Sequence, residues 1–189
     1  MKTTNANKKK SLGEWILDHR PDEELLNFLL LPLAFGAMIN TVTLAMFLSD
    51  CGTFGSILSW ILIIIVAIAY YGIYYELFGD DAELFSLQSI WAFMKFTFAM
   101  TLSGICYLIT FGFITKFAVH DLMGTPHGGS YSVDSVSALG GILLLLGLTA
   151  LTLYSIYAFK SDDPRAASRA ATLLLAAMAA NFLCFVISH

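Results

Sequence analysis

The side chains of this sequence that could do chemistry are few, and most lie as single polar groups within long apolar runs. Asn40 lies near the middle of the first run, and Gly36, Thr43 and Phe47 share its helical face at spacings of four, three and four. Because an amide in lipid requires a hydrogen-bond partner, this face predicts a bond between helices. The alternative is a face that lines a pore or contacts a substrate.

Small and weakly polar residues recur at helical spacings in three later runs. They are Thr97, Thr101 and Gly104, then Gly140 and Gly147, and finally Ala170, Ala177 and Asn181. Small faces let helices approach closely in lipid, so these residues are candidates for helix packing, and Leu174 is expected to lie off the last face. The alternative is a hydrated path lined by Asn40, Thr43, Thr97, Thr101 and Asn181.

Two opposite charges are expected at matching depth near one membrane interface. Glu76 ends the second apolar run and Lys95 lies just inside the third, so antiparallel helices would bring them together. The sequence therefore predicts an ion pair between Glu76 and Lys95, which would spare each charge the cost of burial. The tyrosines beside Glu76 predict an interfacial aromatic belt, with a quinone or lipid-headgroup site as the alternative. These are Tyr70, Tyr71, Tyr74 and Tyr75.

Motifs for enzymatic chemistry are missing from the sequence. His120, Asp121, His127 and Asp134 gather in one glycine-rich loop, but their spacing matches no metal-ligand pattern, so a solvated loop is expected and no metal. No GxSxG, HExxH or glycine-rich phosphate loop occurs, and no histidine lies within an apolar run where it could hold haem. We therefore expect no cofactor and no catalytic residues. A membrane enzyme that uses the loop histidines and aspartates is the alternative.

The composition indicates that these groups are positioned by membrane-spanning helices. Of the 189 residues, 58% are hydrophobic and only 13% are charged, which is too few to cover a soluble protein. Five apolar runs are each long enough to cross a hydrocarbon core of about 30 Å. They are Leu25–Leu48, Ile57–Leu77, Ile90–Phe117, Val136–Phe159 and Ala166–Ile187. The expected fold is an all-α integral membrane protein, with residues 25–189 as one five-helix bundle. The longest loop of this bundle is expected at residues 118–135.

The segment before the bundle, residues 1–24, has local order of its own. Ser11 and Glu14 fit a capping box, and Leu12, Trp15 and Ile16 share a helical face. The pattern predicts a short amphipathic helix on the membrane surface, and a docking helix for a cytoplasmic partner is the alternative. No cleavage site for a leader follows early, so the first run is expected to be retained as a signal anchor.

The distribution of Lys and Arg predicts the orientation of the chain. With the N-terminus in the cytoplasm and five spans, nine of the ten Lys and Arg lie on the cytoplasmic side, and Lys116 is the exception. The C-terminus is then external, and a bacterial inner membrane is the expected location. Three unlinked cysteines are expected, and the alternative is a bridge between Cys51 and Cys184 near the outer face.

Small-residue faces without catalytic motifs favour a non-enzymatic membrane subunit that scaffolds or positions the parts of a larger assembly. A secretion or conjugation apparatus and a respiratory complex are settings of that kind. The expected partners are the lipid bilayer and other membrane subunits or further copies of the chain, and no nucleic acid. The alternative is a small oligomeric transporter or channel, which a continuous hydrated path would favour over a dry helix seam.

Overall fold

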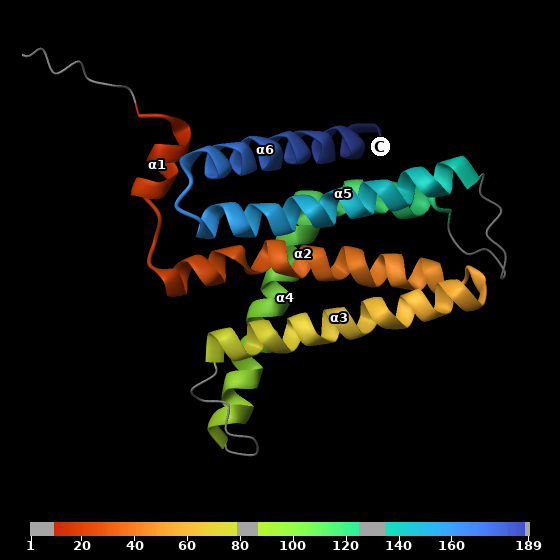
Figure 1. Ribbon diagram of the computed structural model, residues 1–189, viewed down its shortest axis with the longest axis horizontal. Helices are drawn as coiled ribbons and strands as arrows, with labels where there is room; N and C mark the ends of the chain where they lie inside the picture. Colours follow the sequence, from red (N-terminus) through yellow and green to blue (C-terminus); the bar gives the residue numbers. More distant parts are fainter. Residues whose placement is uncertain (1–9, 79–86, 125–134, 188–189) are drawn as a thin grey trace, which may run out of the picture.

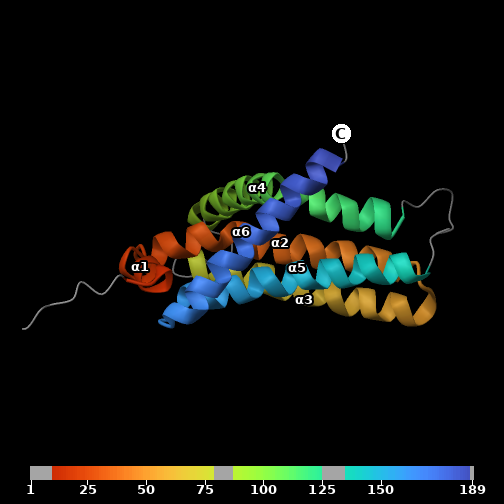
Figure 2. The same ribbon diagram turned by 90° about the horizontal axis from the view of Figure 1, so that it is seen from above.

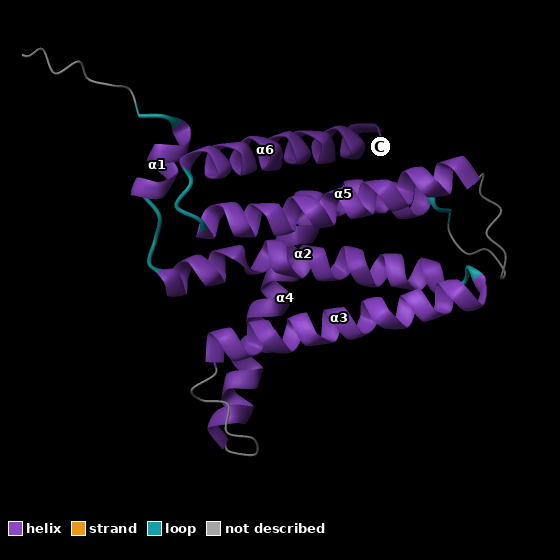
Figure 3. Ribbon diagram, viewed as in Figure 1, coloured by secondary structure: helices purple, strands orange, loops and turns teal. Residues whose placement is uncertain are grey.

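The fold is a bundle of long helices, and the computed structural model describes residues 10–78, 87–124 and 135–187. The elements are α1 (Leu12–Asp18), α2 (Glu23–Ser49), α3 (Gly52–Phe78), α4 (Leu87–Lys116), the π-helical turn η2 (Phe117–Leu122), α5 (Ser135–Lys160) and α6 (Pro164–Ile187). Every regular element in the described ranges is helical (Figure 3). Five of the helices are long and apolar enough to cross a membrane. The structure therefore confirms the expected all-helical chain with five helices of spanning length.

The capping box at the start of α1 is confirmed. The Ser11 hydroxyl accepts from the Glu14 N–H at 3.3 Å, and the Glu14 carboxylate accepts from the Ser11 N–H at 2.7 Å. Gly13 lies so close to α6 that a Cβ there would be 1.7 Å from the Pro164 carbonyl oxygen. Close backbone contact therefore docks α1 against the start of α6, while the apolar side chains of Leu12 and Trp15 stay exposed.

The centre of the bundle is α2. Its two sides contact α3 and α5, and α4 crosses a further face (Figures 1 and 2). α6 packs against α5 and the end of α4. α1 and the α5–α6 connection lie at one end of the bundle, which we call the α1 end, and the α2–α3 turn lies at the opposite end (Figure 1). Helices α3 and α5 run in the same direction, so both finish at the α1 end.

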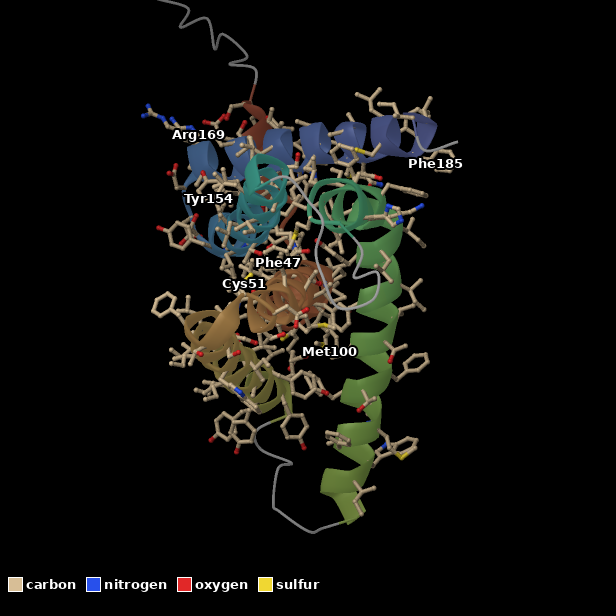
Figure 4. All side chains as sticks on the ribbon, turned by 90° about the vertical axis from the view of Figure 1, so that its right-hand side faces the viewer. Phe47, Cys51, Met100, Tyr154, Arg169 and Phe185 are labelled. Carbon is tan, nitrogen blue, oxygen red and sulfur yellow. The ribbon has the colours of Figure 1, made fainter. Side chains whose placement is uncertain are left out.

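Helix α4 is bent. Its first half crosses the other helices steeply, whereas its last part runs beside α5 (Figures 1 and 4). Its 30 residues make about 45 Å of helix, more than the roughly 30 Å that a perpendicular span requires. Phe96 and Met100 of this helix are buried against Leu31 and Met38 of α2.

The long loop after α4 begins later than the sequence predicts. Residues 118–122 continue as η2, which packs on α5, and Met123 is only 1% exposed. Ala118, Met123 and Leu145 form a buried cluster there. The prediction failed because His120 and Asp121 end the apolar run in sequence, but their side chains point to the surface while their neighbours pack inward.

The turn between the first two long helices is also tighter than predicted. α3 begins at Gly52, whose φ of 84° lies in the left-handed region, rather than at Ile57. Cys51 lies in this turn (Figure 4), and no disulfide joins it to Cys184.

Candidate functional site

Asn40 forms the bond between helices that its position predicts. Its Oδ1 accepts from the Tyr107 hydroxyl of α4 at 3.0 Å, and the two side chains are each 1% exposed. Gly36, one turn earlier, makes room for the Tyr107 ring, because a Cβ there would lie 2.1 Å from Cε2. Asn40 thus closes a seam between α2 and α4.

Asn181 joins α6 to the backbone of α4. Its Oδ1 accepts from the N–H groups of Phe113 at 2.9 Å and Ile114 at 3.1 Å, and its Nδ2 donates to the Ile109 carbonyl at 3.4 Å. In a regular helix these two N–H groups bond to the carbonyls four residues earlier. The amide therefore enters the hydrogen-bond ladder of α4, which is a known cause of helix bends.

The threonines do not converge with these amides. Thr43, Thr97 and Thr101 each donate to a carbonyl of their own helix, four residues earlier, at 2.8–2.9 Å. Thr97 and Thr101 lie on the exposed face of α4, away from buried Asn40. The hydrated path that the sequence offered as an alternative is therefore not brought together. Its two amides lie in separate helix contacts, and Thr97 and Thr101 lie on the surface.

The small residues divide into packed and uncovered positions. Gly104 lets α2 approach, since a Cβ there would lie 2.6 Å from the Phe35 ring, and Ala170 is fully buried between α5 and α6. Gly140 and Gly147 have no neighbour within 4 Å of an added Cβ, so within the described chain they pack against no helix. The neighbours of α5 are α2, α6 and η2, and none of them covers these two glycines, so their predicted packing role is not realised within the described chain.

The packed face of α6 differs slightly from the prediction. Ala177 is half-buried, but so is Leu174, which was expected to lie off this face. Residues 170, 174, 177 and 181 follow spacings of four, three and four, so Leu174 belongs to the same stripe.

The expected ion pair between Glu76 and Lys95 is not formed. Glu76 Oε1 instead lies 2.7 Å from Nζ of Lys160, at the end of α5. Lys95 is exposed, with its ammonium 5.6 Å from the centre of the Trp91 ring. The cause is the steep crossing of α4, which carries Lys95 away, whereas α3 and α5 end together on either side of α2.

The Glu76–Lys160 pair closes one end of an apolar groove of about 260 Å³. The floor of this groove is α2 and its walls are α3 and α5. Its lining residues are Asn27, Leu30, Leu31, Ala34, Ala37, Met38, Thr41, Ile65, Val66, Ala69, Ile73, Glu76, Leu77, Thr149, Leu153, Ile156 and Lys160. Apart from the charged end, three polar side chains line it, so the groove suits a hydrocarbon chain better than a solute in water.

A polar pocket of about 550 Å³ adjoins the groove, and Lys160 lines both. It lies between the end of α1, the start of α2 and the α5–α6 connection, and is lined by Leu17, Arg20, Pro21, Asp22, Glu23, Leu26, Lys160 and Asp162. Arg20 ties its walls together: it donates to Asp162 at 3.0 Å and to the carbonyls of Lys160 and Ser161 at 3.3 Å. Sequence reasoning missed this pocket, since its residues are distant in the chain.

The remaining candidates lie apart from this region. His120 Nδ1 lies 3.2 Å from Asp121 Oδ1 on the surface, while His127 and Asp134 fall outside the described residues. Among the tyrosines, Tyr70 and Tyr74 pack edge-on against Phe96, and Tyr71 and Tyr75 are exposed as an interfacial belt requires.

Comparisons with protein families, with curated proteins and with solved structures gave no match to this chain.

Proposed function

We propose that the chain is a non-enzymatic subunit of a larger membrane assembly, in which it scaffolds or positions other components. The observation that carries this proposal is the way in which the amides of the apolar helices are used. Asn40 and Asn181 both bond across seams between helices, to Tyr107 and to the backbone of α4. A transport path would instead require polar groups that face a shared hydrated space.

The first half of α4 is the surface best placed to meet another subunit. It projects beyond the bundle (Figure 4), and Trp91, Met94 and Phe98 are all more than half exposed. Thr97 and Thr101 lie on the exposed part of the same helix. If the chain is instead an oligomeric transporter, as the alternative holds, these hydroxyls would have to line a path between copies.

Gentle extraction from the native membrane tests the proposal. The chain, of 20.7 kDa, is expected in a species with further subunits, and the double change Trp91→Ala with Phe98→Ala should release it. The matched control is Phe54→Ala with Trp60→Ala on α3, which are at least as exposed as Phe98 and Trp91 and should leave the assembly intact. A single chain at every detergent concentration contradicts the proposal, and solute flux through vesicles of the purified chain supports the transporter.

For the orientation we propose a cytoplasmic N-terminus and an external C-terminus in a bacterial inner membrane. The support is the positive-inside distribution, together with the position of Arg20, Lys160 and Arg165 at the α1 end.

A reporter fused after residue 187 tests this orientation. An enzyme that works only outside the cytoplasm, such as a periplasmic phosphatase, should be active there, and one fused after Lys160 should be inactive. Activity in the reverse pattern contradicts the proposed orientation.

A further inference from the structure

We propose that the groove and the polar pocket together form a binding site for one phospholipid with an ammonium-bearing headgroup, of the phosphatidylethanolamine class. The acyl chain lies in the groove between α3 and α5, and the headgroup lies at the Glu76–Lys160 pair and in the adjoining pocket. Lys160, which lines both spaces, marks the boundary between chain and headgroup.

The length of the groove matches a single leaflet. On α3 it extends from Ile65 to Leu77, about 18 Å of helix, and on α5 from Thr149 to Lys160, about 17 Å of helix. Half of a hydrocarbon core is about 15 Å thick. An acyl chain that enters at the α1 end therefore fills the groove from the charged pair to the middle of the bilayer.

The charges around the pocket favour a zwitterionic headgroup with a free ammonium. The groove and pocket carry two cationic side chains, Arg20 and Lys160, against four carboxylates, from Asp22, Glu23, Glu76 and Asp162. Lys160 and Arg20 provide donors for the phosphate, and the excess of carboxylates attracts the ammonium and disfavours a purely anionic lipid. The side chains of Arg20 and Lys160 are partly exposed, so a lipid headgroup can reach them from the bilayer.

An unpaired acceptor at the same level supports this assignment. Oδ1 of Asn27 lines the groove one turn inside α2, is buried, and has no hydrogen-bond partner within the described chain. Buried amide oxygens in native proteins normally accept a bond. A headgroup with N–H donors offers one, and a trimethylated choline headgroup does not.

Native mass spectrometry of the full chain tests the site. The protein is purified in a mild detergent, stripped of lipid and given phosphatidylethanolamine, phosphatidylcholine or phosphatidylglycerol with the same acyl chains. We expect one phosphatidylethanolamine per chain, retained about tenfold more tightly than the other two lipids. Equal retention of the three lipids, a preference for the anionic lipid, or a dimer that excludes lipid each overturns the proposal.

Two exposed alanines of α3 provide a matched pair of variants. Ala69→Phe places a ring in the groove and should abolish retention, whereas Ala67→Phe lies outside the groove and should behave like the parent. If Ala69→Phe binds as the parent does, the groove is not the site. Should Ala69→Phe fail to fold, Glu76→Gln decides: the preference for phosphatidylethanolamine over phosphatidylcholine should fall, and an unchanged preference overturns the headgroup assignment.

Discussion

Replacement of Tyr107 by alanine is expected to lower the free energy of unfolding in mixed detergent by about 3–5 kcal/mol, the usual cost of deleting a large buried aromatic side chain. Tyr107 is 1% exposed, fills the space over Gly36 and lies 5.3 Å from the Phe111 ring. Its loss also leaves the buried Oδ1 of Asn40 without its hydroxyl donor. Unfolding by SDS, followed by circular dichroism, measures the change.

Two further variants separate packing from hydrogen bonding. Tyr107→Phe keeps the ring and removes only the donor, so it should cost about 0.6–2 kcal/mol, as for other bonds between membrane helices. Tyr71→Ala removes the same side chain from a position that is 64% exposed, and its effect should be small. If Tyr107→Ala and Tyr71→Ala have equal effects, the α2–α4 seam does not hold the bundle.

The helices themselves could be predicted from the sequence because their physical requirement is simple. A span needs about 20 apolar residues, and a capping box needs two residues at a fixed spacing. Both features are local, and the structure confirms five helices of spanning length and the capping box. The start of α3 at Gly52 and the extension of α4 into η2 depend instead on packing between segments, and the sequence placed these boundaries incorrectly.

The packed face of each helix was harder to predict. These helices are apolar on all sides, so hydrophobic periodicity does not separate the interior from the outer surface of the bundle. Small residues are a weaker guide: they identified Gly104 and Ala170 correctly, but Gly140 and Gly147 remain uncovered. Leu174 lies on the packed face, although it was expected to lie off it.

The partner of Glu76 depended on the tertiary arrangement alone. Lys95 and Lys160 were both expected near the same interface, and the choice between them follows from the direction in which α4 crosses the bundle. The groove and its polar pocket combine residues from three or four helices, so no local pattern could have revealed them.

Replacement of Asn181 by leucine is expected to change the shape of α4. The Phe113 and Ile114 N–H groups would lose their acceptor, at about 1–3 kcal/mol for each buried group left unpaired. Inside a hydrocarbon core no water would replace the amide, so the lower-energy outcome is for both groups to bond within their own helix. Helix α4 should then straighten, and its first half should swing relative to the rest of the bundle.

Spin labels at Phe98 in α4 and Tyr157 in α5, both exposed, measure this swing in a background without the three native cysteines. Phe98 lies about 17 Å along the helix from Ile109. A change of about 20° in the bend angle of α4, the threshold for a sharp kink, would therefore move Phe98 by about 6 Å. Ala180→Leu adds a leucine at the adjacent exposed position without removing the amide, and should keep the parent distance. An unchanged distance in Asn181→Leu, with unchanged stability, would show that the bend in α4 does not depend on the Asn181 amide.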